Sequence, residues 1–288
     1  MNKLDACLPL IMRDHERFQL LDQSLRSNFH DINRCWVIVP DREYPEMRGL
    51  LKAPYEVIPE SELIPELRRY RFIRRVMYGR LRRMFWPATR LGRFNLAGWY
   101  VQQLLKLAIA ERIETEFYLT LDADVLCIKP TQYDDLIKEG RALVTTEPYD
   151  AHPDWYVDAQ RILGCQRSGV NYGVTPSILN RNGVLALCRH IESRFIGNWR
   201  TALIRNTPWT EYTLYHTFLE GEGLWDRYHI NGGSDAVYDT YSSLWSKSDN
   251  WNITDALAGN ARFIVIQSTT GIPVEDILER IETFYKEK

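Results

Sequence analysis

Short apolar runs alternate with segments of helical periodicity over the first 130 residues of this 288-residue chain. The runs lie at residues 6–12, 35–39 and 117–121, and their composition is typical of strands buried on both faces of a sheet. Between the first two runs, apolar residues recur every three or four positions, at Phe18, Leu21, Leu25 and Phe29. Strands that alternate with helices predict an α/β fold of Rossmann-like type, with a central, mostly parallel sheet flanked by helices.

The rest of the chain continues this pattern and predicts a single domain over residues 1–288. Further strands are predicted at residues 55–58, 125–128, 141–145, 171–179 and 262–266. Further helices are predicted at residues 97–113, 211–220 and 274–285. No internal repeat or low-complexity linker divides the sequence, so one continuous core is the simplest interpretation.

The composition indicates a soluble globular protein, with 45% hydrophobic and 26% charged residues. The five cysteines are odd in number and widely spaced, which argues against a disulfide framework or a zinc site. No apolar run has the length of a signal peptide or a membrane span. We therefore expect a cytoplasmic protein.

Two acidic residues directly follow the apolar run at residues 117–121, in the sequence Asp122-Ala123-Asp124. Open α/β sheets bind ligands at the carboxyl ends of their strands, so both carboxylates are expected in a site. Neighbouring carboxylates repel each other unless a cation neutralises them, and hard oxygen ligands suit Mg²⁺ or Mn²⁺. The sequence therefore predicts a divalent-metal site at Asp122 and Asp124. Two solvated turn residues are the alternative.

The segment LTLDADVLCIKP resembles the Asp-x-Asp signature of GT-A-fold glycosyltransferases, in which an apolar strand leads into metal-binding acids. Four other segments resemble the same family in the expected order, namely PLIMRDHERFQLLDQSL, VIVPD, GWYVQQLLKLAIAERI and NYGVTPSILN. Within the family, the chain is most similar to a bacterial group associated with polysaccharide synthesis.

The resemblance implies a GT-A-like fold and a metal-dependent enzyme. It would move a sugar from a nucleotide-sugar donor to a glycan or lipid-linked glycan acceptor. Inversion at the anomeric carbon is the expected outcome, and retention is the alternative. Residues 1–130 would then approximate the nucleotide-binding half and residues 131–288 the acceptor half.

The resemblance also implies which residues bind the donor. They are Arg13, Asp14, Asp41, Gln103, Lys106 and Asp122. Three of these residues have a structural alternative. Asp14 could cap a helix, Asp41 could be a turn residue after Pro40, and Lys106 could be a solvated residue on a helix surface.

An inverting transfer needs a base that takes the proton of the acceptor hydroxyl, and a carboxylate within hydrogen-bond reach can do this. Glu211 lies at the start of a predicted helix and resembles the acidic residue that inverting GT-A enzymes place there. Asp235 and Asp154 are the competing candidates. An early helical glutamate also complements the helix dipole, which is the structural alternative.

The third metal ligand in this family is commonly a histidine near the C-terminal end. His229, in the sequence RYHINGGSD, is the nearest candidate here, although no clear family histidine motif surrounds it. Gln267 and Ser268 follow the last predicted strand and are also well placed.

An arginine-rich insertion at residues 68–93 contains ten arginines and no acidic residue. Its apolar residues recur at helical spacing, at Ile73, Met77, Leu81 and Met84. We interpret it as a contact with an anionic membrane surface, where a lipid-linked acceptor would reside. Alternatively, the insertion binds a polyanionic acceptor or the donor diphosphate. A third interpretation is a solvated connector. Nucleic acid is not expected as a partner, because the rest of the chain is acidic and lacks a nucleic-acid-binding signature.

Two other functions compete with the glycosyltransferase. A sugar-phosphate nucleotidyltransferase would also use acidic metal ligands, but it usually has a Gly-rich loop after the first strand, where this chain reads MRDHERF. A non-catalytic module that binds polyanions or membranes through residues 68–93 is the second alternative.

Overall fold

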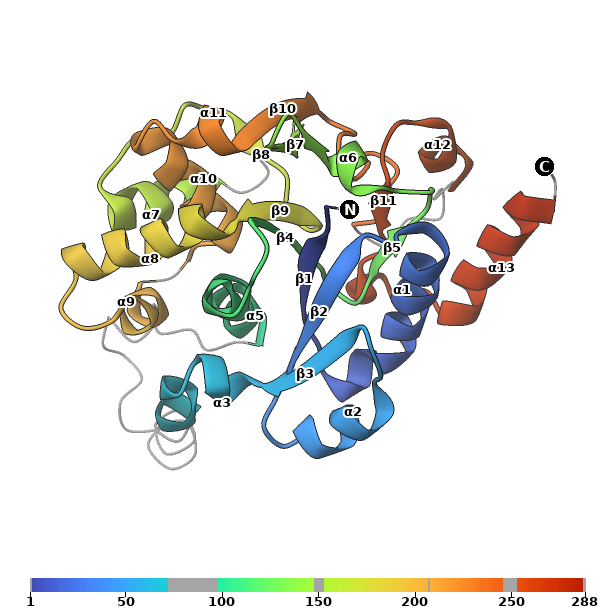
Figure 1. Ribbon diagram of the computed structural model, residues 1–288, viewed down its shortest axis with the longest axis horizontal. Helices are drawn as coiled ribbons and strands as arrows, with labels where there is room; N and C mark the ends of the chain where they lie inside the picture. Colours follow the sequence, from blue (N-terminus) through green and yellow to red (C-terminus); the bar gives the residue numbers. More distant parts are fainter. Residues whose placement is uncertain (1, 72–97, 148–152, 207, 246–252, 287–288) are drawn as a thin grey trace.

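The computed structural model describes residues 2–71, 98–147, 153–206, 208–245 and 253–286. Within these ranges, five strands form the central sheet, in the order β3 (Tyr55–Pro59), β2 (Ile32–Val39), β1 (Leu4–Pro9), β4 (Phe117–Thr120) and β9 (Ser177–Asn180). The first four run parallel to one another, and β9 is antiparallel to β4. The predicted α/β fold, with a central, mostly parallel sheet flanked by helices, is confirmed (Figure 1).

Alternate side chains of the central strands enter two different cores. In β2, Trp36 and Ile38 pack in the core that contains helices α5 (Gly98–Ala108), α8 (Arg181–Arg194) and α10 (Glu211–Gly221). Val37 and Val39 pack on the opposite face, with α1 (His15–Asn28). Full burial of each such side chain stabilises the fold by roughly 1.5–3 kcal/mol. Burial on both faces explains why residues 35–39 of this strand are continuously apolar.

Two smaller sheets accompany the central one (Figure 1). In the first, β7 (Arg141–Glu147) pairs with β10 (His229–Gly233), β6 (Ile137–Lys138) and β8 (Asn171–Tyr172). In the second, β5 (Val125–Cys127) pairs with β11 (Phe263–Val265) in antiparallel fashion. Further helices are α2 (Tyr44–Leu50), α3 (Glu60–Leu63), α6 (Tyr133–Leu136), α7 (Pro153–Leu163), α9 (Trp199–Arg205), α11 (Trp225–Tyr228), α12 (Ile253–Ala258) and α13 (Val274–Lys286).

The single strand predicted at residues 171–179 is wrong, because this segment forms two strands in two different sheets. β8 pairs with β7, whereas β9 pairs with β4 in the central sheet. Pro176 lies between them and has no N–H group to donate to a strand ladder. Gly173 packs so closely that an added Cβ would lie 2.5 Å from the Tyr238 hydroxyl. The chain therefore changes sheets at this point.

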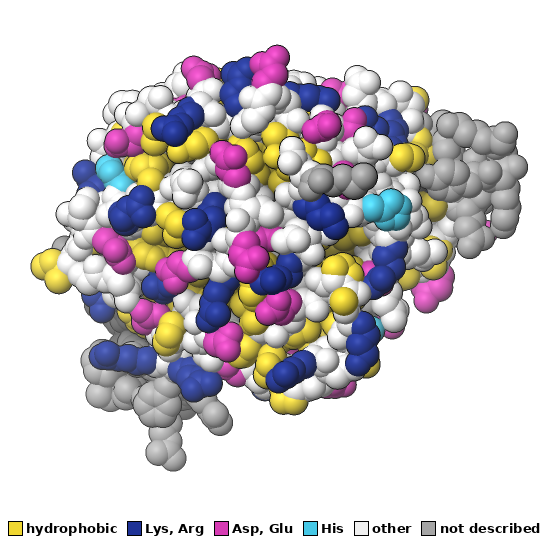
Figure 2. All heavy atoms as spheres, in the orientation of Figure 1, with side chains coloured by type: hydrophobic (Ala, Val, Ile, Leu, Met, Phe, Trp, Pro, Cys, Tyr) yellow, Lys and Arg dark blue, Asp and Glu magenta, His cyan; other side chains and the backbone are white. Residues whose placement is uncertain are grey.

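Most of the predicted arginine-rich insertion, from residue 72 onward, lies outside the described residues. At its start, Arg68 lies 3.5 Å from Asp41, and Arg71 forms an ion pair with Glu60. Figure 2 shows cationic and anionic side chains interspersed over one face of the molecule. No helix in the described part of the chain is both long and apolar enough to cross a bilayer. A membrane contact by residues 68–93 stays a prediction.

Candidate active site

Asp122 and Asp124 lie in the turn that connects β4 to β5. The amide of Val125 donates to the carbonyl of Asp122 at 3.2 Å and closes this turn. The turn therefore follows the carboxyl end of β4, a central strand that runs parallel to β1. Open α/β sheets bind ligands at this end of their strands. The side chain of Asp122 is 28% exposed, so part of its carboxylate faces solvent.

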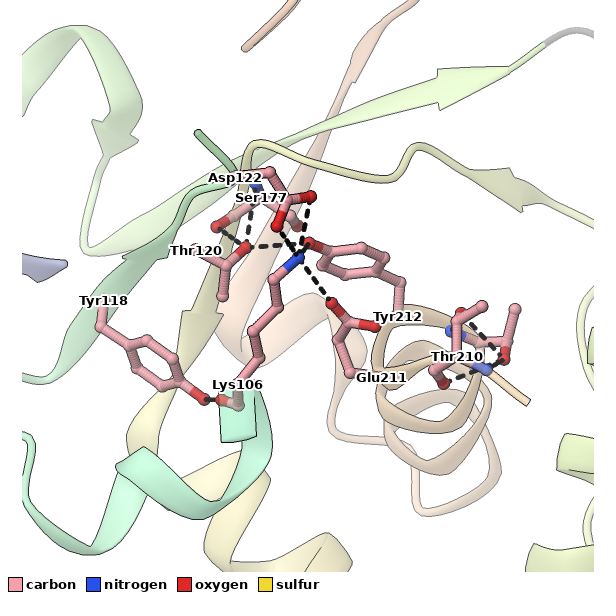
Figure 3. A network of polar contacts seen from close by, with 9 residues as sticks. Lys106, Tyr118, Thr120, Asp122, Ser177, Thr210, Glu211 and Tyr212 are labelled. Carbon is pink, nitrogen blue, oxygen red and sulfur yellow. Dashed lines mark hydrogen bonds and ion pairs between the residues drawn. The ribbon is translucent and has the colours of Figure 1, made fainter. Parts of the chain in front are cut away.

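The buried ammonium group of Lys106 binds Asp122 from inside the protein (Figure 3). The Lys106 side chain, on α5, is 1% exposed, and its Nζ lies 2.9 Å from Oδ1 and 3.1 Å from Oδ2 of Asp122. The same Nζ lies 3.2 Å from Oε1 of Glu211 and 3.1 Å from the hydroxyl of Tyr212. One cation therefore joins the carboxylate of the turn to a carboxylate of helix α10.

Glu211 is the first residue of α10 and is fully buried. The preceding residue, Thr210, caps this helix, since its hydroxyl accepts a hydrogen bond from the Thr213 amide at 3.0 Å. Gln103 lies one helical turn before Lys106, and its side-chain amide faces the carboxylate of Glu211. With the nitrogen oriented toward this carboxylate, Gln103 can donate a hydrogen bond to Oε1 at 3.0 Å. The helix start predicted at Glu211 is confirmed, and the helix N-terminus also favours a negative charge there.

A series of hydroxyl groups fixes the position of this cluster (Figure 3). The hydroxyl of Tyr212 lies 3.1 Å from Oγ1 of Thr120, which donates to the carbonyl of Ser177 at 3.0 Å. These bonds tie α10 to β4 and β9. Sequence reasoning missed both hydroxyl side chains. The available signal was that Thr120 is the one polar residue in the strand FYLTL, directly ahead of the two aspartates.

The pKa values of Lys106 and Glu211 are both raised, for different reasons. Burial alone would lower the pKa of Lys106, but its acidic neighbours, Asp122 first, raise that pKa above the ordinary value. Burial raises the pKa of Glu211, Lys106 opposes this shift, and the charge on Asp122 adds to it. Lys106 is therefore charged at neutral pH and holds the two carboxylates together.

Asp124 has different surroundings from Asp122. Its Oδ2 accepts a hydrogen bond from the backbone amide of Ser268 at 2.9 Å. Burial and the charge on Asp122 raise the pKa of Asp124 to about 6. Among the described residues, no lysine or arginine forms an ion pair with it, so its charge is compensated less fully than that of Asp122. A small hollow beside it is lined by Arg17, Leu20, Ala123, Asp124, Leu126, Ile266 and Ile277.

Over residues 1–288, the sequence matches a family described as a family of unknown function (DUF6492). The chain belongs to this family. No curated protein matches the sequence of this DUF6492 chain. Among solved structures, it is similar to one of the galactosyltransferase LgtC in complex with donor and acceptor sugar analogs. The TM-score is 0.47 and the sequence identity 10%, over 97% of this chain and 96% of that chain. A likeness this distant says nothing about what the DUF6492 chain binds.

The nucleoside-binding residues predicted for this DUF6492 chain follow β1 and β2. Arg13 is exposed and lies 3.3 Å from the carboxylate of Asp14. Asp14 is the N-cap residue of α1, but its side chain forms no capping hydrogen bond. Asp41 follows β2 and lies 3.5 Å from Arg68. These strands are parallel to β4, so the three residues lie toward the same sheet edge as the Asp-x-Asp turn. Their binding of a nucleoside stays a prediction.

His229 lies in β10 and is fully buried. Its Nε2 is 2.8 Å from the hydroxyl of Tyr215, and its ring packs against those of His216 and Trp225. Burial lowers its pKa to about 3. The residues that the structure describes contain no group of three or more His, Cys, Asp or Glu side chains able to hold a metal. The structure thus does not bring His229 together with the Asp-x-Asp turn.

The two other candidates for the base have separate surroundings. Asp235 accepts hydrogen bonds from the backbone and side-chain amides of Asn260, both at 3.2 Å. Asp154 is exposed in the first turn of α7. Within the described ranges, neither forms a hydrogen bond or an ion pair with the Lys106 cluster. Of the three candidates, Glu211 is the one that Lys106 connects to the Asp-x-Asp turn.

Proposed function

We propose that this chain is a glycosyltransferase that moves a sugar from a nucleotide-sugar donor to a glycan or lipid-linked glycan acceptor. One observation carries the proposal, the pair of carboxylates in the turn after β4, at the ligand-binding edge of the sheet. Buried Lys106 compensates one of them, and burial leaves the other with a pKa of about 6. The resemblance of this segment to the Asp-x-Asp signature supports the same function.

Mn²⁺ or Mg²⁺ is the cofactor that fits these residues. Both ions prefer carboxylate oxygens, and Asp122 and Asp124 are both only partly buried. Burial and the charge on Asp122 raise the pKa of Asp124, so a cation bound there would stabilise its ionised form. When bound by these two residues, the ion would neutralise charge on the departing nucleoside diphosphate.

Glu211 is our candidate for the base, with Asp235 as the second. The base would accept the proton of the acceptor hydroxyl as this oxygen attacks the anomeric carbon and the bond to the nucleoside diphosphate breaks. Attack on the face opposite the leaving group gives inversion. Lys106 and Gln103 enclose the carboxylate of Glu211, so the acceptor would have to displace one of these contacts. Because both are buried, Lys106 and Gln103 would influence the donor through the carboxylates that they hold.

Hydrolysis of a panel of UDP-, GDP- and CMP-sugars in the presence of Mn²⁺ tests the proposal. We expect the chain to hydrolyse one donor class and to lose this activity with a chelator. Asp122→Asn and Asp124→Asn should each reduce the rate by at least about 100-fold, since a metal supplies several kcal/mol of charge stabilisation. The matched control is Asp134→Asn, at an exposed position in α6, which should retain the rate.

The alternatives differ in this assay, because a non-catalytic module would hydrolyse none of the donors. Equal rates for the wild type and both turn variants would contradict the proposal. A requirement for nucleoside triphosphate and sugar phosphate would indicate the nucleotidyltransferase. For the base, Glu211→Gln should lower transfer by about 10²–10⁴-fold, and Asp235→Asn should not.

A further inference from the structure

The ammonium group of Lys106 has no hydrogen left for a ligand. A lysine ammonium donates three hydrogen bonds. In the described structure, Nζ has three partners, namely the carboxylate of Asp122, the carboxylate of Glu211 and the hydroxyl of Tyr212. With its side chain 1% exposed, Lys106 is not arranged to meet a phosphate of the donor directly. Its charge serves the protein's own carboxylates.

Lys106 contacts the carboxylate of Asp122, which a metal ion at this site would also bind. Both oxygens of Asp122 lie within 3.1 Å of Nζ, and the side chain of Asp122 is 28% exposed to solvent. A divalent cation that approaches from solvent would therefore share the carboxylate with a positive charge already in contact with it. Coulomb repulsion from Lys106 therefore lowers the affinity of this site for the divalent cation.

We propose that Lys106 is a built-in counter-ion that competes with the divalent cation for Asp122 and thereby couples metal binding to the Lys106–Glu211 ion pair. The inference rests on the proposed function, because it assumes that the turn holds a metal. A metal that draws the charge of Asp122 toward solvent leaves Lys106 more fully paired with Glu211. Lys106 is then a positioning residue, which acts through Asp122 and Glu211.

A lysine with a purely structural role would not couple metal binding to the Lys106–Glu211 ion pair. Buried ion pairs can often be replaced by apolar residues of similar volume without loss of stability, so cohesion between α5, β4 and α10 does not require a charge. Removal of Lys106 alone would leave Glu211 buried without its cation, which is strongly destabilising. The informative variant therefore removes both charges of the buried pair and leaves Asp122 in place.

The test is a Mn²⁺ titration of the full chain without donor, followed by the electron paramagnetic resonance signal of free Mn²⁺. The Lys106→Met/Glu211→Gln double variant should bind Mn²⁺ about tenfold more tightly than the wild type, because it removes a cation from a partly exposed carboxylate. Glu211→Gln alone keeps Lys106 on Asp122 and should not tighten binding. Thermal unfolding checks that each variant is folded.

Asp124→Asn separates failure of this inference from failure of the proposed function. If Asp124→Asn weakens Mn²⁺ binding but the double variant binds as the wild type does, the competition is refuted and the metal site stands. If Asp124→Asn and the wild type bind equally, the metal site itself is refuted, and the inference with it. Tighter binding by the double variant, together with loss in Asp124→Asn, supports both.

Discussion

At the residue scale, two aspartates only two positions apart have unlike electrostatic surroundings. Asp122 has the ammonium group of Lys106 on both of its oxygens, whereas Oδ2 of Asp124 accepts a hydrogen bond from the backbone amide of Ser268 at 2.9 Å and has the charge of Arg17 nearby. The charge on Asp122 contributes to the raised pKa of Asp124, so the two carboxylates still influence each other. In the absence of a metal, ionisation of Asp124 in the folded protein therefore carries a free-energy cost.

Asp124→Asn should stabilise the metal-free protein at neutral pH. The folded-state pKa of Asp124 is about 6, above the ordinary 3.8, so the protein loses stability as the pH rises from the lower value through the higher one. After discounting for partial exposure, we expect the variant to be more stable by about 1–2 kcal/mol at pH 7.5. The difference should disappear below about pH 4. Urea unfolding in chelator, at several pH values, measures it. Equal stability at pH 7.5 would show that the carboxylate is already compensated.

At the scale of secondary-structure elements, helix α10 organises the candidate site. Its first two residues, Glu211 and Tyr212, bind Lys106, and its next turn places Tyr215 and His216 in the aromatic cluster around His229. The start of the helix is set by the Thr210 cap. A small shift at this cap would move Glu211 relative to Lys106.

Thr210→Ala should therefore reduce both stability and activity. Loss of the cap costs about 1 kcal/mol. Asn198 provides a matched control, because it caps α9 by accepting a hydrogen bond from the Thr201 amide at 2.8 Å. Asn198→Ala should cost a similar amount in unfolding experiments but leave the rate of donor hydrolysis unchanged. If both variants lose activity to the same extent, α10 has no special role in positioning Glu211.

The sequence allowed prediction of elements more readily than of contacts between them. The strand at β4 and the aspartates after it could be predicted, because burial on both faces demands a continuous apolar run. Periodicity also predicted the helix that contains Lys106, and the resemblance singled out Glu211. Their ion pair could not be predicted, since it depends on how α5 packs against α10, far apart in the sequence. The break between β8 and β9 was missed for the same reason, as strand period alone does not identify the partner strand.

At the scale of the whole molecule, buried histidines make stability sensitive to acid. His216 and His229 are fully buried, and burial lowers both pKa values, that of His229 to about 3. As the pH falls below about 6.5, the unfolded chain gains protons that the folded chain does not, so folding loses about 1.4 kcal/mol per pH unit for each histidine.

His229→Gln should make the pH dependence of stability shallower. Glutamine can keep a hydrogen bond to Tyr215 but does not titrate. Between about pH 4 and 6, the slope of unfolding free energy against pH should decrease by about 1.4 kcal/mol per unit relative to the wild type. Denaturant unfolding at half-unit intervals measures both slopes. Parallel curves would mean that His229 becomes charged in the folded protein.

The outer position of β9 has a consequence for the order in which a nascent chain can fold. β4 is synthesised well before β9, so its outer edge has no partner until residues 177–180 have left the ribosome. The contacts of Lys106 are completed later still, because two of its partners, Glu211 and Tyr212, are synthesised after β9. An early fold of the first 130 residues would have an open strand edge beside a lysine with half of its counter-charge missing. Completion of the candidate site is thus a late event in synthesis.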